Sequence, residues 1–82
     1  MTNLIVALPK LEDAKNIKNM LVRNGFRVIG VCTAGDQVIG LTDGLNGGIV
    51  ICSYKLTDMV YSGLRECLPE GFELLLLASD RL

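Results

Sequence analysis

Ser53 is the residue whose chemistry matters most, because it follows a strongly apolar segment of the chain. Segment 47–59 begins with Gly47 and Gly48, continues through the apolar residues 49–52, and becomes polar at Ser53. A short apolar run bounded by turn formers is typical of a strand buried on both faces of a parallel sheet. In open α/β sheets ligands bind at the carboxyl ends of the strands, which is where we expect Ser53 to lie.

Three acidic side chains are further candidates for chemistry at the same edge. Glu12 and Asp13 fall in the first turn of a predicted helix, and Asp58 follows the central strand. Acid–base catalysis by these groups is one interpretation. We favour a structural one, in which Glu12 and Asp13 interact with a helix amino terminus and Asp58 caps the next helix. Ser53 is a candidate phosphorylation site or ligand-binding hydroxyl, but we expect it to satisfy a backbone group of its own loop.

Several kinds of catalytic site are excluded by composition. The chain has no histidine, and its three cysteines are Cys32, Cys52 and Cys67. A Cys–His nucleophile therefore cannot form within the chain, and no CxxC pair or usual zinc ligand set is present. We expect reduced, partly buried cysteines that act as small hydrophobes. Neither GxGxxG nor GxxxxGK[ST] occurs, so nucleotide binding has no support. We predict no enzymatic activity and no cofactor.

The apolar pattern predicts the elements that position these residues. Strands are expected at 3–8, 26–32, 49–52 and 72–78, and helices at 11–24, from 33 or 34 to 45, and at about 59–67. Pro9 ends the first strand, and Asn24 with Gly25 ends the first helix. Strands and helices alternate, and right-handed crossovers of this length predict a doubly wound, mostly parallel four-stranded α/β sheet with helices on both faces.

Charge and hydropathy limit the expected partners. Eight Lys and Arg residues against nine Asp and Glu residues give a net charge of -1. Direct nucleic-acid binding by this segment is disfavoured because phosphate neutralisation needs a basic stripe. No apolar run approaches the roughly 18–20 residues of a membrane-spanning helix, and no basic region precedes the apolar amino terminus. We therefore expect a cytoplasmic protein without a membrane partner.

The last predicted strand is unusual because it contains four consecutive leucines, Leu74, Leu75, Leu76 and Leu77. Such a strand needs apolar cover and a neighbouring strand, and an open apolar edge invites pairing with another copy. The chain is either a fragment of a longer doubly wound domain or a domain that completes its core by association. We favour a homodimer with these leucines as the association surface, and other signalling proteins are further possible partners.

Several segments resemble the receiver domain of two-component response regulators. They are Asn-Leu-Ile-Val at 3–6, Leu-Val-Arg-Asn-Gly-Phe-Arg-Val at 21–28, and Gly-Ile-Val-Ile-Cys-Ser-Tyr-Lys-Leu-Thr-Asp-Met at 48–59. Leu-Pro-Lys-Leu-Glu-Asp-Ala at 8–14 resembles the opening of receivers attached to ANTAR RNA-binding domains, which act in transcription antitermination. The resemblance implies a flavodoxin-like strand order of 2-1-3-4. It covers the first two thirds of a receiver, so residues 1–82 are expected to form a single receiver-like domain without the last strand and helices.

Position by position, the resemblance places unreactive residues where a receiver is active. Ser53 stands at the phosphoacceptor position, and Ala7 and Leu8 stand where the magnesium-binding acid pair belongs. The hydroxyl position falls at Ala78, with Ser79 one place later, and the lysine of the fifth strand has no counterpart. Aspartyl phosphorylation needs a carboxylate and a divalent cation held by oxygen ligands. We therefore expect no magnesium-dependent phosphotransfer at this site.

The resulting hypothesis is a non-enzymatic pseudo-receiver module of a bacterial response regulator. It would act in a phosphorelay or in transcription antitermination by phosphorylation-independent protein association, and an ANTAR output domain beyond Leu82 would carry RNA binding. The alternative is a small-molecule-binding regulatory domain. In that case Ala7 and Leu8, in place of acids, would make the cleft beside Ser53 suitable for an apolar metabolite.

Overall fold

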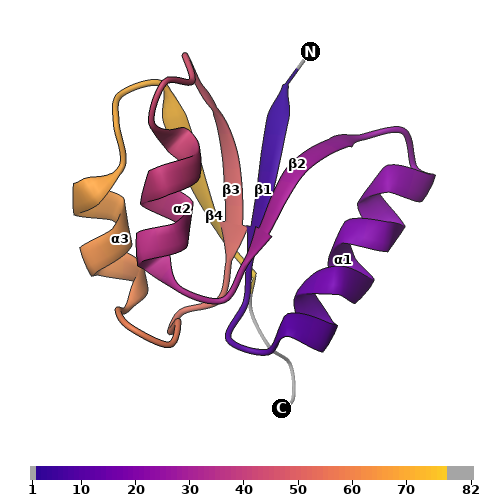
Figure 1. Ribbon diagram of the computed structural model, residues 1–82, viewed down its shortest axis with the longest axis horizontal. Helices are drawn as coiled ribbons and strands as arrows, with labels where there is room; N and C mark the ends of the chain where they lie inside the picture. The colour runs from indigo at the N-terminus through magenta and orange to yellow at the C-terminus, as the bar shows by residue number, and fades with distance from the viewer. Residues whose placement is uncertain (1, 78–82) are drawn as a thin grey trace.

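Strands and helices alternate along the part of the chain that the computed structural model describes, residues 2–77 (Figure 1). The strands are β1 (Asn3–Ala7), β2 (Arg27–Cys32), β3 (Gly48–Cys52) and β4 (Phe72–Leu76), and the helices are α1 (Leu11–Arg23), α2 (Gly35–Thr42) and α3 (Tyr61–Cys67). None of these helices combines the length and the apolar character needed to span a membrane.

The four strands form one parallel sheet in the order β2-β1-β3-β4, a flavodoxin-like topology. The predicted α/β fold and its strand order are therefore confirmed. β1 and β3 are the central strands, and β2 lies at an edge, as its mixed polarity predicts. β4 forms the other edge.

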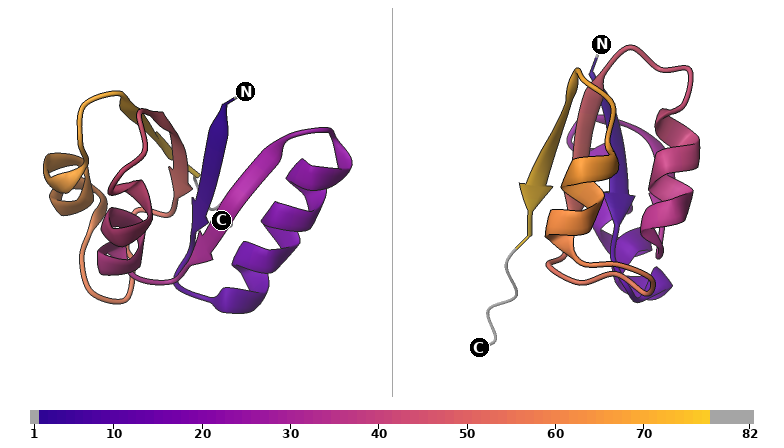
Figure 2. Two further views of the ribbon diagram at one scale, coloured as in Figure 1. Left: turned by 45° about the horizontal axis from the view of Figure 1, so that its top comes forward. Right: turned by 90° about the vertical axis from the view of Figure 1, so that its left-hand side faces the viewer.

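Helices lie on both faces of the sheet (Figure 2). α2 and α3 cover one face, and α1 covers the other only where it lies against β1 and β2. Because successive side chains of a strand point to opposite faces, β1 contributes to both cores. The core on the α2 and α3 side contains Ile5, Ala7, Cys32, Val38, Val50, Cys52, Leu56 and Leu64, and the core under α1 contains Val6, Leu8 and Ala14.

A register shift in β2 explains why its apolar side chains do not alternate regularly between the two faces of the sheet. Leu4 of β1 pairs with Val28, but the next residue, Ile5, pairs with Gly30, so one residue of β2 is extra at this point. Such a bulge lets two side chains three positions apart face the same side. Val28 and Val31 consequently both pack on the core under α1.

α1 ends as predicted, at a glycine with left-handed backbone. Gly25 has a φ of 89°, which a residue with a side chain rarely adopts. The N–H of Gly25 donates to the Val22 carbonyl at 3.0 Å, and the N–H of Phe26 donates to the Leu21 carbonyl at 3.0 Å. These two bonds form a Schellman motif, which satisfies carbonyl groups of the last helical turn.

The buried stripe of α1 contains only some of the apolar residues that fall at helical spacing. Ala14 is fully buried, and Ile17 and Leu21 pack beside it against β1 and β2. Leu11 and Met20 are each 49% exposed, although helical spacing alone allowed both on the apolar face. The helix therefore presents Leu21, not Met20, to the sheet.

α2 ends three residues before the predicted boundary at Leu45. Asp43 takes an extended backbone conformation, and Gly44 has a φ of 86°. The hydroxyl of Thr42, a buried side chain, donates to the Ile39 carbonyl at 2.9 Å. The Asp43–Gly44 pair is thus the helix stop, and the later glycines lead into β3.

α3 begins two residues after the predicted start because residues 55–60 form a closed loop. Lys55 and Val60 make an isolated antiparallel bridge, and the N–H of Leu56 donates to the Met59 carbonyl at 2.8 Å. Leu56 is buried, so this loop packs into the core. β4 ends at Leu76, before the predicted boundary.

Candidate functional site

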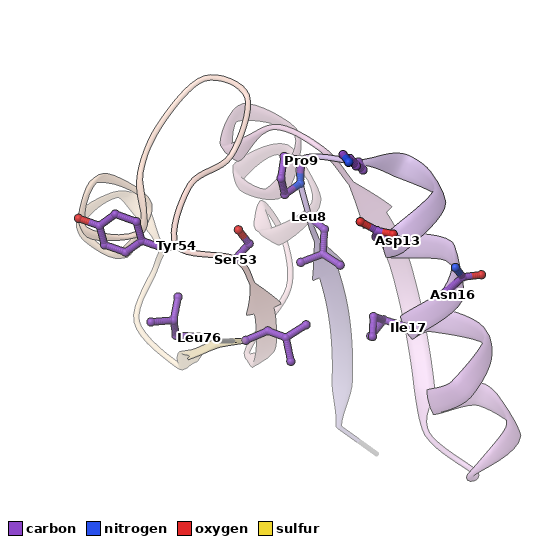
Figure 3. Close-up of a pocket in the computed structure, with 10 residues that line it drawn as sticks. Leu8, Pro9, Asp13, Asn16, Ile17, Ser53, Tyr54 and Leu76 are labelled. Atoms are coloured by element: carbon purple, nitrogen blue, oxygen red, sulfur yellow. The ribbon is translucent and has the colours of Figure 1, made fainter. Parts of the chain in front are cut away.

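A hollow of about 640 Å³ lies at the carboxyl end of the sheet, between α1 and the ends of β1, β3 and β4 (Figure 3). Its volume falls within the roughly 300–1,000 Å³ of small-molecule sites. The residues that line it come from segments far apart in the sequence. They are Leu8, Pro9, Lys10, Asp13, Asn16, Ile17, Ser53, Tyr54, Leu76 and Leu77.

One wall of the hollow is a face of α1. Asp13, Asn16 and Ile17 are spaced by three and four residues, so they lie on neighbouring turns of one side of the helix. Figure 3 shows Ile17 and Asp13 on the side of α1 that is directed towards Leu8. This face adjoins the buried stripe of α1, and it combines an apolar side chain with two polar ones.

Ser53 borders the hollow, but its hydroxyl is bonded within its own loop. The hydroxyl donates to the Lys55 carbonyl at 3.1 Å and accepts from the Lys55 N–H at 3.4 Å. The Ser53 N–H donates to the Ala7 carbonyl at 3.2 Å and so continues the pairing of β3 with β1. The side chain therefore satisfies backbone groups of its loop, the role we preferred for it.

The other receiver-like positions are apolar and buried where the structure describes them. Ala7 is fully buried on the α2 and α3 side, and Leu8 is buried under α1 while also bordering the hollow. Among the residues that the structure describes, the floor beside Ser53 consequently lacks the carboxylates of a magnesium site. Ala78, the predicted hydroxyl position, lies outside the described residues.

Asp58 has a different role from the predicted cap of the following helix. Its carboxylate accepts a hydrogen bond from the Gly35 N–H at 2.6 Å and another from the Asp36 N–H at 3.0 Å. It therefore caps α2, and Val60, the residue before α3, makes no side-chain cap. The hydrogen bonds from Gly35 and then Asp36 lower the pKa of the Asp58 carboxyl below its ordinary value, because they stabilise its charged form.

The acidic candidates do not converge on one point. Asp13 borders the hollow, and Asp58 is bound to the start of α2. Glu12 is exposed in the first turn of α1. Within residues 2–77, no three acidic or cysteine side chains are close enough together to hold a metal ion.

The cysteines are free thiols in two different environments. Cys32 is buried at the end of β2 and Cys52 is buried at the end of β3, with β1 between these strands. Cys67 is exposed at the end of α3. Burial raises the pKa of the Cys32 thiol, and it raises that of Cys52 to about 11. At neutral pH these two buried groups are protonated thiols that pack as small hydrophobes.

The four leucines near the carboxyl end have unequal surroundings. Leu74 packs against the core on the α2 and α3 side, whereas Leu75, Leu76 and Leu77 are exposed. Leu76 and Leu77 also border the hollow.

Sequence reasoning located the floor of the hollow at Leu8 and Ser53 but missed Lys10, Asn16 and Tyr54. The signal that could have found Lys10 and Asn16 was their position beside the apolar stripe of α1.

No protein-family model, no curated protein and no solved structure matches this chain.

Proposed function

We propose that this chain is a non-enzymatic, receiver-like signalling module that acts by associating with a second copy of itself through β4. The observation that carries the proposal is the exposure of three successive leucines at an edge of the sheet. Leu75 is 50% exposed, Leu76 is 46% exposed and Leu77 is 40% exposed. Because successive side chains point to opposite faces, apolar surface is open on both faces of this edge.

The face of the sheet that α1 covers only in part adds to this surface. Ile51 of β3 pairs with Leu75 of β4, so the two side chains lie next to each other on that face. α1 contacts β1 and β2, and in Figure 2 no helix of the described chain lies over β3 and β4 on this side. Burying these side chains against a second copy would remove their apolar surface from water.

The backbone of β4 supports the same partner. β4 pairs with β3 along one side only, and within residues 2–77 no strand pairs with its other side. Unpaired edge groups accept another strand readily. A twofold axis beside β4 would let the two copies pair with the same surface, as most homodimers do.

The signalling part of the proposal is supported by the strand order and by the receiver-like segments. Loss of phosphotransfer is supported by Ser53, whose hydroxyl is bonded to its loop, and by Ala7, which is buried in the core. The state of association, in place of a phosphoryl group, would then transmit the signal within a response regulator.

Light scattering over a wide range of concentrations tests the association. We expect twice the monomer mass for the wild-type chain and the monomer mass for L75E, because a buried unpaired carboxylate is costly. V22E is the matched control, since Val22 on α1 is also 50% exposed and lies far from β4 in the chain. It should remain dimeric. A wild-type monomer at every concentration, or a dimeric L75E, would contradict the proposal.

A second measurement tests the absence of phosphotransfer. The chain is incubated with Mg²⁺ and an acyl phosphate, and its intact mass is recorded. We expect no change of mass, since the site offers no carboxylate nucleophile at Ser53. A stable phosphoryl adduct would overturn the non-enzymatic part of the proposal.

A further inference from the structure

The hollow lies at the point where the chain reverses its direction of winding across the sheet. From β1 the chain crosses to β2 on one side, and β3 lies on the other side of β1. Connections that leave two neighbouring strands in opposite directions open a crevice outside their carboxyl ends, and ligands of open α/β proteins bind there. Leu8 and Ser53, which follow β1 and β3, both border the hollow.

The lining divides into an apolar part and a polar part. Leu8, Pro9, Ile17, Leu76 and Leu77 supply the apolar part. The polar part comes mainly from the start of α1. Lys10 precedes the helix, Asp13 lies in its first turn, and Asn16 follows one turn later. Among the described residues, the hollow therefore offers one cationic and one anionic side chain within one turn of each other, next to an apolar surface.

This combination selects among classes of ligand. A phosphate ester is disfavoured because Lys10 is the single cation among the described residues that line the hollow, and Asp13 would repel a second negative charge. A pure hydrocarbon would remove the charged groups from water without pairing them, which is costly. A divalent cation finds no cluster of three acidic or cysteine ligands in residues 2–77. A small zwitterion with an apolar body can pair with both Lys10 and Asp13 and pack on the apolar part of the lining.

We infer that the hollow binds a small zwitterion of no net charge with an apolar body, the class to which the apolar α-amino acids belong. The carboxylate of the ligand would pair with Lys10 and its ammonium group with Asp13. The apolar body would pack on Leu8 and Ile17. This site shares Leu76 and Leu77 with the surface proposed for association, whereas Leu75 belongs to that surface and does not line the hollow.

An NMR titration of the complete chain with L-leucine tests the inference. We expect saturable amide shifts at Lys10, Asp13 and Ser53, and none at Gly25, at the far end of α1. For a ligand of this size we expect a Kd of about 1 mM or tighter. Absence of saturable shifts at Lys10, Asp13 and Ser53 would overturn the inference.

Two analogues of leucine test the contribution of each of its charged groups while keeping its apolar body. Isopentylamine and 4-methylpentanoate keep an apolar body like that of leucine, but each lacks one of its two charges. Each should bind about tenfold more weakly than L-leucine, because one charged hydrogen bond is lost. If either analogue binds as tightly as L-leucine, the assignment to zwitterions is wrong.

Variants identify the two charged partners. K10M and D13N should each weaken binding of L-leucine about tenfold. K15M and E12Q are matched controls on the same helix, because neither Lys15 nor Glu12 borders the hollow. All four side chains are exposed, so the fold should be retained. Unchanged binding by K10M and D13N would contradict the inference.

Binding and association can fail independently, and L75E distinguishes them. Leu75 does not border the hollow, so L75E should bind L-leucine as the wild-type chain does. Binding by a wild-type chain that proves monomeric would support this inference and contradict the association. A dimeric chain that does not bind L-leucine would support the association and contradict this inference.

Discussion

The carboxylate of Asp58 binds the first residue of α2, accepting a hydrogen bond from the Gly35 N–H at 2.6 Å. These residues are 23 positions apart: Asp58 belongs to the loop that follows β3, and Gly35 comes directly after the loop that follows β2. Thr57 adds to the contact, since its N–H and its hydroxyl donate to the Thr33 carbonyl at 3.2 and 3.0 Å. Two loops at the carboxyl end of the sheet are thereby joined into one unit.

Replacing Asp58 with alanine should lower the melting temperature by several degrees. The substitution leaves the N–H groups of Gly35 and Asp36 without their acceptor at a helix amino terminus. Asp43 provides the control, because it lies at the opposite end of the same helix. A negative charge is unfavourable there, so D43A should be neutral or slightly stabilising. An equal decrease in melting temperature for D58A and D43A would contradict the capping role of Asp58.

The stabilisation by Asp58 should depend on pH in a defined direction. Its folded-state pKa lies below the unfolded value of about 3.9. The contribution is therefore complete above the unfolded pKa and is lost as the pH falls through the folded pKa. Urea unfolding should give a constant difference between wild type and D58A near neutral pH and a shrinking one in acid. A difference that persists unchanged in strong acid would be inconsistent with an ionised cap.

Two glycines of α2 should respond oppositely to alanine. A Cβ at Gly35 would overlap the side chain of Met59, whereas nothing lies within 4 Å of a Cβ at Gly40. G35A should cost at most about 1 kcal/mol of unfolding free energy, because the flexible Met59 side chain can shift to relieve much of the overlap. G40A should gain about 0.5–1 kcal/mol from helix propensity. Chemical denaturation measures both, and adding M59A to G35A should recover part of the loss if the overlap is its cause.

The cysteines should differ in reactivity towards an aromatic disulfide reagent. In the folded chain at neutral pH we expect fast reaction of Cys67, which is exposed. Cys32 and Cys52 should react only after unfolding, because burial excludes the reagent and raises their thiol pKa values. The control is C67S, which should show no fast phase. Fast reaction of a second thiol in the native chain would contradict the prediction, because it would show that the reagent reaches Cys32 or Cys52.

Local signals in the sequence predicted the boundaries that depend on neighbouring residues. Asn24 and Gly25 end α1 because only a glycine readily takes the left-handed conformation of a Schellman motif. The same kind of signal at Asp43 and Gly44 ends α2, but the apolar residue Leu45 concealed it. The missed boundary was thus a choice between two competing local patterns.

The sequence by itself determined the alternation of elements, the parallel sheet, and the apolar character of the floor at Ala7 and Leu8. These features follow from apolar periods and turn residues, which act over a few positions. The strand order came only from the resemblance to receivers, because local patterns do not encode which strands pair. Only the tertiary structure decided that Asp58 caps α2 and that Lys10 and Tyr54 border one hollow. Such contacts join segments that crossovers bring together, and their partners depend on how helices pack and twist over the sheet, which no local pattern encodes.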